Sequence, residues 1–419
     1  MTPTAADSGS KRAAGIFLLF ALPYFLSANL RAINAVIAPE LTQEFALSAS
    51  QLGLLSSAYF IGFAALQLPL GQWLDRYGPR RVEVAFLAVA VLGTVLFASV
   101  RSFAGLVLAR ALLGLGVSAC LMAPYAGYRQ WFAPVLLTRL SSWMLMTGSL
   151  GMIASTLPVQ WLLPHIGWRG VFALAAALLG LSLLLIYFFS PRADQEYPSA
   201  PRQIKKDATS YRAVFKHPYF VAQLPLCMVT YGGLLALQTL WVGPWLTSVV
   251  GLTPAQAAWG VMTVHVAMLL AFLSWGLMLP RLLARGWHAI DVVAWGTWLG
   301  IGLLAAVAWR GAQAGALWWA AALVGLTPVA VSQIQVSQAF PREAAGRANG
   351  AMNFALMLGS FAVQWGLGAL ADVFGAAGYG TEARFRAALA VLVGAMLLAQ
   401  LWLLAMRRRV LPGVPAHTA

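Results

Sequence analysis

The chain has 419 residues, of which 61% are hydrophobic and 9% are charged, whereas about a quarter of the residues in an ordinary soluble domain are charged. This composition excludes a soluble globular protein. It predicts an all-α membrane protein, because each helical crossing of a bilayer takes about 20 apolar residues. The apolar runs do not alternate with polar residues, which excludes a transmembrane β-barrel. The net charge of +15 comes mainly from scattered Arg residues, so we expect it to face the lipid bilayer and not nucleic acid.

Twelve apolar runs, separated by charged residues, Gly or Pro, predict twelve transmembrane helices. The first six runs lie at residues 14–38, 49–70, 82–100, 103–127, 139–163 and 168–189. The second six lie at residues 218–247, 256–279, 289–309, 314–339, 345–371 and 385–406. The polar segment 191–217 is rich in Pro, Ser and basic residues and is interpreted as a cytoplasmic linker. It divides an N-terminal six-helix bundle, residues 1–190, from a C-terminal bundle with a short cytoplasmic tail, residues 218–419.

Basic residues are distributed unequally between the two ends of the predicted helices. With a cytoplasmic N-terminus, 20 of the 27 Lys and Arg residues lie in inside segments and 5 in outside segments, while Arg31 and Arg110 fall within helices. Because basic loops stay on the cytoplasmic side, we expect both termini in the cytoplasm and the protein in a bacterial-type inner membrane. Residues 1–12 lack a cleavable signal, and the first apolar run is long enough to remain as a helix.

The connection between the second and third spans carries an unusual sequence. It reads Gly71-Gln72-Trp73-Leu74-Asp75-Arg76-Tyr77-Gly78-Pro79-Arg80-Arg81. This loop resembles the signature of the major facilitator superfamily, which has a Gly, a spaced Asp-Arg, a second Gly and two basic residues. The resemblance implies two pseudo-symmetric six-helix bundles that latch together on the cytoplasmic side, with gating residues Gly71, Asp75, Arg76, Gly78, Arg80 and Arg81. A plain positive-inside loop would explain the arginines but not Asp75 or the glycines.

Weaker matches to the same superfamily follow in chain order. They are Arg110 with Gly114 and Gly116, the run Gly167-Trp168-Arg169-Gly170-Val171-Phe172, and the run Gly346-Arg347-Ala348-Asn349-Gly350. The antiporter signature of the superfamily is not matched by the fifth span, which reads Gly148-Ser149-Leu150-Gly151. This departure argues against a drug/proton exchanger.

The first span carries a polar stripe formed by Tyr24, Ser27, Arg31 and Asn34, whose spacing puts them on one helix face. An Arg inside a membrane helix costs at least about 2.5 kcal/mol and is by default a functional hypothesis. The alternative is that Arg31 snorkels to the outer headgroups. The stretch from Arg31 to Pro39 resembles the first span of organic anion/cation symporters, which have an Asp where this chain has Leu30. The resemblance implies anion recognition but not proton coupling through that carboxylate.

The fourth span places Arg110 and Tyr125 on one face, and Arg110 joins Arg31 as a second cation within a helix. Two buried cations without a mid-span carboxylate favour a negatively charged substrate. We expect Arg31 and Arg110 to share one anionic ligand. The alternative for Arg110 is a structural hydrogen bond to backbone carbonyls of a neighbouring span.

The C-terminal half offers amide and aromatic side chains that could orient a substrate. These are Tyr231, Gln238 and Trp241 on one face of the seventh span, Gln335 in the tenth and Asn353 in the eleventh. Hydrogen bonding between helices is the more common use of such residues. His265, in the middle of the eighth span, could exchange a proton near neutral pH, although a packed neutral histidine is the alternative.

These features favour a secondary active transporter, a symporter of a small organic anion, that works as a monomer by rocking its two halves, with a coupling proton or cation. The rival function is efflux of hydrophobic compounds, suggested by 17 Trp and 21 Phe. An enzyme would need clustered catalytic side chains, whereas the five His are dispersed. Cys120 and Cys227 lie in apolar stretches and support neither a disulfide nor a metal cluster, so no cofactor is expected.

Overall fold

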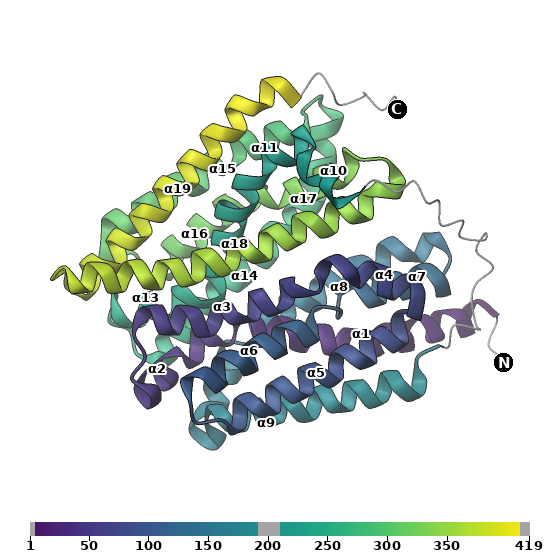
Figure 1. Cartoon of the computed structure of the whole chain (residues 1–419), viewed down its shortest axis with the longest axis horizontal. Coiled ribbons are helices and arrows are strands. Elements are labelled where there is room, and N and C mark those ends of the chain that lie inside the picture. Colours follow the sequence, from purple (N-terminus) through teal and green to yellow (C-terminus); the bar gives the residue numbers. More distant parts are fainter. Residues whose placement is uncertain (1–4, 192–209, 411–419) are drawn as a thin grey trace.

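The computed structural model describes residues 5–191 and 210–410, and helices make up almost all of this part of the chain. The N-terminal half contains α1 Ala5–Ala32, α2 Asn34–Phe45, α3 Ala49–Ala65, α4 Gln67–Tyr77, α5 Pro79–Ser99, α6 Phe103–Val117, α7 Met122–Trp131, α8 Pro134–Ala154 and α9 Leu157–Phe189. The C-terminal half contains α10 Tyr211–Lys216, α11 Pro218–Leu226, η1 Cys227–Tyr231, α12 Gly232–Ala236, η2 Leu237–Trp241, α13 Val242–Ser248, α14 Pro254–Ala284, α15 Ala289–Arg310, η3 Gly311–Gln313, α16 Ala316–Leu326, η4 Thr327–Ala330, α17 Val331–Gln338, α18 Arg342–Ala376 and α19 Thr381–Val410. Figure 1 shows the two halves as two bundles lying side by side.

The helices cross the molecule from one end to the other. Ten helical segments of the described chain are long and apolar enough to span a membrane, and the bent pair α3 and α4, which meets at 46°, brings the number to eleven. The expected fifth span is divided between α8 and the start of α9. Two helical segments of α9 meet at Gly167, whose φ of 65° turns the chain into the sixth span. The all-helical fold expected from the sequence is therefore confirmed.

The end of the predicted linker is ordered as a helix. Residues 192–209 lie outside the described residues, whereas α10 occupies part of the range that was expected to be linker. The Tyr211 hydroxyl of α10 donates a hydrogen bond of 2.8 Å to the carbonyl of Leu68 in α4. α10 therefore ties the C-terminal half to the N-terminal half at the first turn of α4.

Several spans contain an interruption of the regular α-helix. Each interruption shifts the 3.6-residue period from which the sequence analysis assigned residues to a helix face. The first span breaks at Ile33 between α1 and α2, and the second at Leu66 between α3 and α4. The seventh span contains two π-helical turns, η1 and η2, each of which widens the helix. Pro39 and Pro225 lie inside their helices without a large break.

The N-terminal bundle is held tightly by glycines at the crossing of α3 and α6. A Cβ atom at Gly62 would lie 1.9 Å from the carbonyl oxygen of Ala111, and one at Gly114 would lie 2.0 Å from that of Tyr59. Only glycine allows the two backbones to approach so closely. This crossing sets the positions of Tyr59 on α3 and Arg110 on α6.

The two halves meet chiefly along α3 and α18, which lie next to each other in the middle of Figure 1. A Cβ at Gly368 of α18 would lie 2.2 Å from the carbonyl oxygen of Ala49, and one at Gly53 of α3 would lie 2.8 Å from that of Gln364. On the other side of the interface, α14 packs against α2, α8 and α9. At the first turns of α3 the backbones of the two halves are therefore in contact, and a side chain larger than that of glycine would not fit at Gly53 or Gly368.

The Gly-Trp-Arg motif that opens the sixth span has a structural role at the same end of the molecule. Glu44, in the last turn of α2, accepts hydrogen bonds from Trp168 Nε1 at 2.8 Å and from Arg169 Nη1 at 2.9 Å. The closest oxygen–nitrogen distance in its ion pair with Arg169 is 2.6 Å. Burial raises the pKa of the Glu44 carboxyl, but the Trp168 and Arg169 donors outweigh it and hold this pKa below its ordinary value.

We expect Glu44→Gln to destabilise the protein at neutral pH by under about 1 kcal/mol, because the ion pair is more than one-third exposed and is screened by water. A lowered pKa in the folded state stabilises the fold above the ordinary pKa of Glu, and this contribution is lost as the pH falls through the folded-state value. Thermal unfolding of both proteins in detergent across acidic and neutral pH measures the difference. A gap in melting temperature that does not narrow in acid would contradict the assignment.

Candidate functional site

Arg31 lies next to the break in the first span and faces both halves of the protein. It is half-buried near the end of α1, and its guanidinium lies close enough to the Tyr24 hydroxyl to interact with it. It is also close enough to Tyr59 of α3 and Tyr231 of η1 to interact with their phenol groups. Its Nε is buried and has no hydrogen-bond partner among the described residues. One cation and three phenols therefore converge where the two bundles meet.

The remainder of the polar stripe packs on α3 and not on lipid. The Asn34 amide nitrogen donates a 2.6 Å hydrogen bond to Ser56 Oγ, while its Oδ1 has no partner among the described residues. The Tyr59 hydroxyl donates to the carbonyl of Ser27 at 3.2 Å. These contacts hold the end of α1 and the start of α2, on either side of Arg31, against α3.

Arg110 is fully buried and contacts the backbone beside Arg31. Its Nη1 donates a 2.9 Å hydrogen bond to the carbonyl oxygen of Leu30, in the last turn of α1. The guanidinium also lies over the rings of Tyr59, at 5.6 Å, and Phe97, at 5.7 Å. These contacts match the structural alternative for Arg110, a hydrogen bond to a backbone carbonyl of a neighbouring span. Arg110 therefore influences the Arg31 site indirectly, through its contacts with Leu30 and Tyr59.

Tyr24 has neighbours that the sequence patterns did not connect with it. Tyr125 of α7 interacts with Tyr24 and donates a 3.4 Å hydrogen bond to the carbonyl of Ser141. A Cβ at Gly148 of α8 would lie 2.7 Å from the Tyr24 ring. Gly148 therefore makes room for the Tyr24 ring. The sequence analysis mentioned Gly148 only because the fifth span departs from the antiporter signature, and it did not predict this contact.

The expected polar face of the seventh span is divided by the π-helical turns. Tyr231 lies near Arg31, whereas Trp241 donates from Nε1 to the carbonyl of Gln364 at 3.0 Å and packs on Phe385 at 5.9 Å. Each π turn adds a residue to the helical repeat, so side chains spaced for one face of an α-helix diverge. Tyr231 and Trp241 therefore have different neighbours, and a shared role for them in binding substrate stays a prediction.

Gln335 and Asn353 serve other networks. Gln335 Oε1 accepts hydrogen bonds from the Tyr219 hydroxyl at 2.9 Å and from Gln223 Nε2 at 2.6 Å, within the C-terminal half. Asn353 Nδ2 donates to Gln67 Oε1 at 2.9 Å, which links α18 to the start of α4. Neither contact set includes Arg31, so the structure does not bring these two residues to the same site.

His265 and Gln238 form a further contact near the interface between the halves. His265 is buried on α14, and its Nε2 lies 3.2 Å from the carbonyl oxygen of Gln238. The Gln238 amide nitrogen lies 3.9 Å from the sulfur of Met152 on α8. His265 Nδ1 has no partner among the described residues. The histidine is packed against backbone in this structure.

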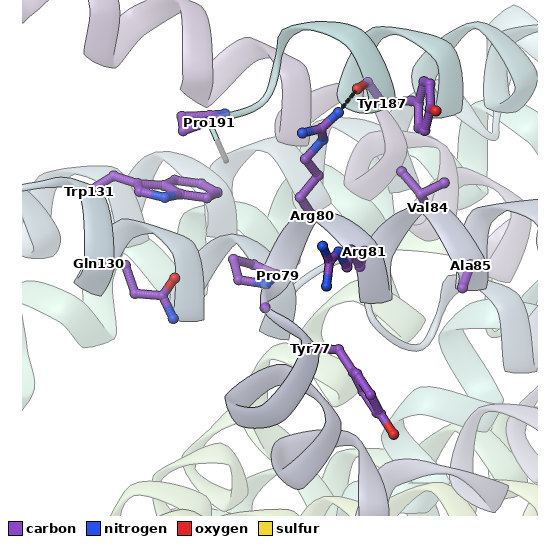
Figure 2. A pocket seen from close by; sticks show the side chains of 11 residues that line it. Tyr77, Pro79, Arg80, Arg81, Val84, Ala85, Gln130, Trp131, Tyr187 and Pro191 are labelled. Atoms are coloured by element: carbon purple, nitrogen blue, oxygen red, sulfur yellow. Dashed lines mark hydrogen bonds between the residues drawn. The ribbon is translucent and has the colours of Figure 1, made fainter. Parts of the chain in front are cut away.

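The predicted gating loop joins α4 to α5 through Gly78, whose φ is 81°. Asp75 and Arg76 are exposed on the last turn of α4, with Arg76 over the Tyr77 ring at 5.3 Å, and Gly71 is exposed one turn earlier. Arg80 donates a hydrogen bond to the carbonyl of Tyr187 at the end of α9, beside a cavity that Arg81 also lines (Figure 2). α4 packs against α18, so the loop lies beside the other half of the protein.

A further contact between the halves, made by Asp372, was not predicted from the sequence. Asp372, near the end of α18, accepts hydrogen bonds from Ser48 Oγ at 2.7 Å and from the backbone nitrogens of Ala49, at 3.1 Å, and Ser50, at 2.9 Å. A carboxylate at a helix N-terminus satisfies free amide groups and interacts favourably with the helix dipole. Asp372 thus caps α3 across the interface. A single Asp near the end of an apolar run has no sequence pattern that predicts this role.

Comparisons with known proteins agree with this architecture. A relative described as a probable sulfoacetate transporter, SauU, from Cupriavidus necator is 29% identical over 57% of this chain and 58% of its own length. A gallate transporter from Pseudomonas putida is 32% identical over 39% of this chain and 36% of its own. The chain thus spans less than two-thirds of the length of these relatives.

Solved structures show the same fold at low sequence identity. A bacterial homologue of the human lysosomal transporter Spinster, in an inward-facing and unoccupied conformation, has a TM-score of 0.77 and 18% identity, over 97% of this chain and 99% of that one. A D-xylose-proton symporter has a TM-score of 0.72 and 17% identity, over 94% and 97%. The family model that matches residues 20–364 is the Major Facilitator Superfamily. This chain belongs to the Major Facilitator Superfamily.

Proposed function

We propose that the protein is a secondary transporter that moves a small organic anion across the membrane by alternating access. The observation that carries this proposal is Arg31, a half-buried cation beside Tyr24, Tyr59 and Tyr231 with an unpartnered Nε. A guanidinium offers paired donors that match a carboxylate or a sulfonate. Relatives described as transporters of sulfoacetate and gallate, both organic acids, support the same substrate class.

Each residue near Arg31 has a distinct proposed role. Tyr24 and Tyr231 reach the guanidinium from opposite halves, so an anion bound by Arg31 would contact both bundles. A ligand held by both halves favours the state in which they are closed around it. Arg110 acts as a positioning residue, because its hydrogen bond to Leu30 fixes the backbone next to Arg31.

We propose that His265 carries proton coupling. Its Nε2 contacts the backbone of Gln238, and the imidazole also lies against the backbone of Met152 in the other half. A proton gained at this imidazole would add a charge beside that interface. The family's first-span carboxylate is absent, since Leu30 stands in its position.

We expect Arg31→Lys to weaken binding of an organic anion by about 1 to 3 kcal/mol, because an ammonium cannot reproduce the paired donors of a guanidinium. The measurement is a thermal-shift titration of purified protein with sulfoacetate, gallate and 4-hydroxybenzoate, followed by uptake into vesicles. Arg101→Lys, at an exposed position between α5 and α6, is the matched control and should bind like wild type.

Unchanged anion binding by the Arg31→Lys protein would contradict the proposal that Arg31 binds the anion. Stabilisation by neutral or cationic drugs, with no response to acids, would instead favour the efflux function.

Alternating access requires that the α3 end of the interface both closes and opens. We propose that the structure represents the state closed at this end, supported by the Asp372 cap and by the backbone contact at Gly368. Each is a contact that must break when the halves separate. Gly368 lies against the carbonyl of Ala49, which cannot move without shifting the start of α3.

We expect Gly368→Ala to disfavour the closed state by about 1 to 3 kcal/mol, since overpacking a tight contact costs this much. Such a change shifts the ratio of states by about 5- to 150-fold. Gly366→Ala on the same helix is the control, because a Cβ at Gly366 meets nothing within 4 Å. Labelling of a single cysteine at Ser50 by a membrane-impermeant reagent should rise in the Gly368→Ala protein and not in the control. Equal labelling of the two variants would show that the contact between Gly368 and Ala49 does not hold this end of the interface closed.

We also propose that both termini are cytoplasmic, from the excess of basic residues at that end. The start of α1 and the end of α19 lie at the same end of the molecule in Figure 1, as this orientation requires. Reporter fusions after Arg12 and at the C-terminus should report a cytoplasmic location for both, and a periplasmic signal from either would reverse the assignment of every loop.

A further inference from the structure

A cavity of about 520 Å³ lies within the N-terminal bundle at the end where α4 finishes and α5 begins. It is separate from the Arg31 site and is formed by the predicted gating loop, the end of α7 and the end of α9 (Figure 2). The loop contributes Tyr77, Arg80 and Arg81, while α7 contributes Trp131 and α9 contributes Tyr187. The transport cycle proposed above gives this cavity no role.

The charge of the cavity is one-sided. Arg80 and Arg81 occupy the first turn of α5, and none of the described residues that line the cavity is acidic. The first amide groups of a helix lack partners within the helix, so they add to the positive potential of the two guanidiniums. Arg80 is held in place, because it donates to the carbonyl of Tyr187 and lies over the Tyr187 ring at 5.5 Å. The site is therefore built for an anion before any ligand arrives.

The remaining walls are aromatic and apolar. Tyr77 and Tyr187 are about half exposed, at 46% and 51%, and Val84 and Ala85 extend the wall along α5. Tyr and Trp side chains prefer the boundary between headgroups and hydrocarbon, where one part of the ring is wet and another is apolar. A ligand that fits must combine a negative group with an apolar part. A phospholipid headgroup and the start of its acyl chains have this combination.

We propose that the cavity binds the phosphate group of an anionic phospholipid from the adjoining leaflet. The phosphate lies against Arg80, Arg81 and the first turn of α5, with the glycerol and acyl chains along Val84, Ala85 and Tyr187. Basic pockets between membrane helices bind such headgroups. A soluble phosphate ester offers the same anionic chemistry without the acyl chains, and the two sources are distinguished by experiment. Because α4 packs against α18, a ligand in the cavity would brace the α4–α5 connection beside the other half of the protein.

The test is thermal unfolding of purified protein in a neutral detergent, titrated with short-chain phosphatidylglycerol, short-chain phosphatidylcholine or glycerol 3-phosphate. A ligand that binds the folded state raises the melting temperature. We expect phosphatidylglycerol to stabilise wild type and to bind the Arg80→Gln/Arg81→Gln protein at least about tenfold more weakly, because two charged hydrogen-bond donors are lost. Arg285→Gln, at an exposed basic position on the equivalent loop of the C-terminal half, should respond like wild type.

A response to glycerol 3-phosphate as strong as that to phosphatidylglycerol would make the ligand a soluble phosphate ester, held by the same arginines. Equal loss of lipid binding in the Arg285→Gln protein would overturn the proposal, because the attraction would then be general surface charge. If the double variant fails to fold, Arg81→Gln alone is titrated, and native mass spectrometry of wild type is added. Wild type that retains no phosphatidylglycerol under conditions that preserve the fold would also overturn the proposal.

Discussion

The structure depends on how a guanidinium is accommodated inside the membrane. Arg110 is completely buried, and the cost of taking its charge out of water must be offset by hydrogen bonds and by contact with aromatic rings. The hydrogen bond to Leu30 and the rings of Tyr59 and Phe97 provide this compensation. This side chain joins α6, which carries it, to three other spans, and its hydrogen bond to Leu30 holds the end of α1 next to Arg31. The glycines at the α3–α6 crossing allow the helices to come close enough for these contacts.

The sequence predicted the approximate limits of most spans because hydrophobic length is a direct consequence of bilayer thickness. It predicted twelve spans, whereas ten helical segments of the described chain, or eleven with the bent pair α3 and α4, are long and apolar enough to cross a membrane. It identified the residues near Arg31 on the first span, since a polar stripe at helical spacing cannot face lipid. It did not predict the π turn that ends at Trp241, because such a turn depends on tertiary packing and leaves no mark on a 3.6-residue pattern. It also failed for Asp372, whose partner lies 324 positions away at Ser48.

Arg110 illustrates a different limit. Its type and position identified it as important, and both a ligand role and a structural role were consistent with the sequence. Only the three-dimensional position of Leu30 separates them, because a carbonyl acceptor belongs to the backbone and is present at every residue. Gly148 and Gly368 are similar cases: a glycine is common in membrane helices, and what it lies against decides whether it matters.

The unequal continuity of the helices at the main interface has a mechanical consequence. α18 runs unbroken for 35 residues, roughly 50 Å, whereas its partner span is divided into α3 and α4 at a bend of 46°. A continuous helix moves as one rigid body, so a displacement at one end also displaces the other end. A pair of helices joined at a bend can change the angle between them instead. Gln67 lies at that joint and is hydrogen-bonded to Asn353, about one-third of the way along α18. α18 can therefore pivot at this pair, so that it separates from the start of α3 while it keeps its contact with α4.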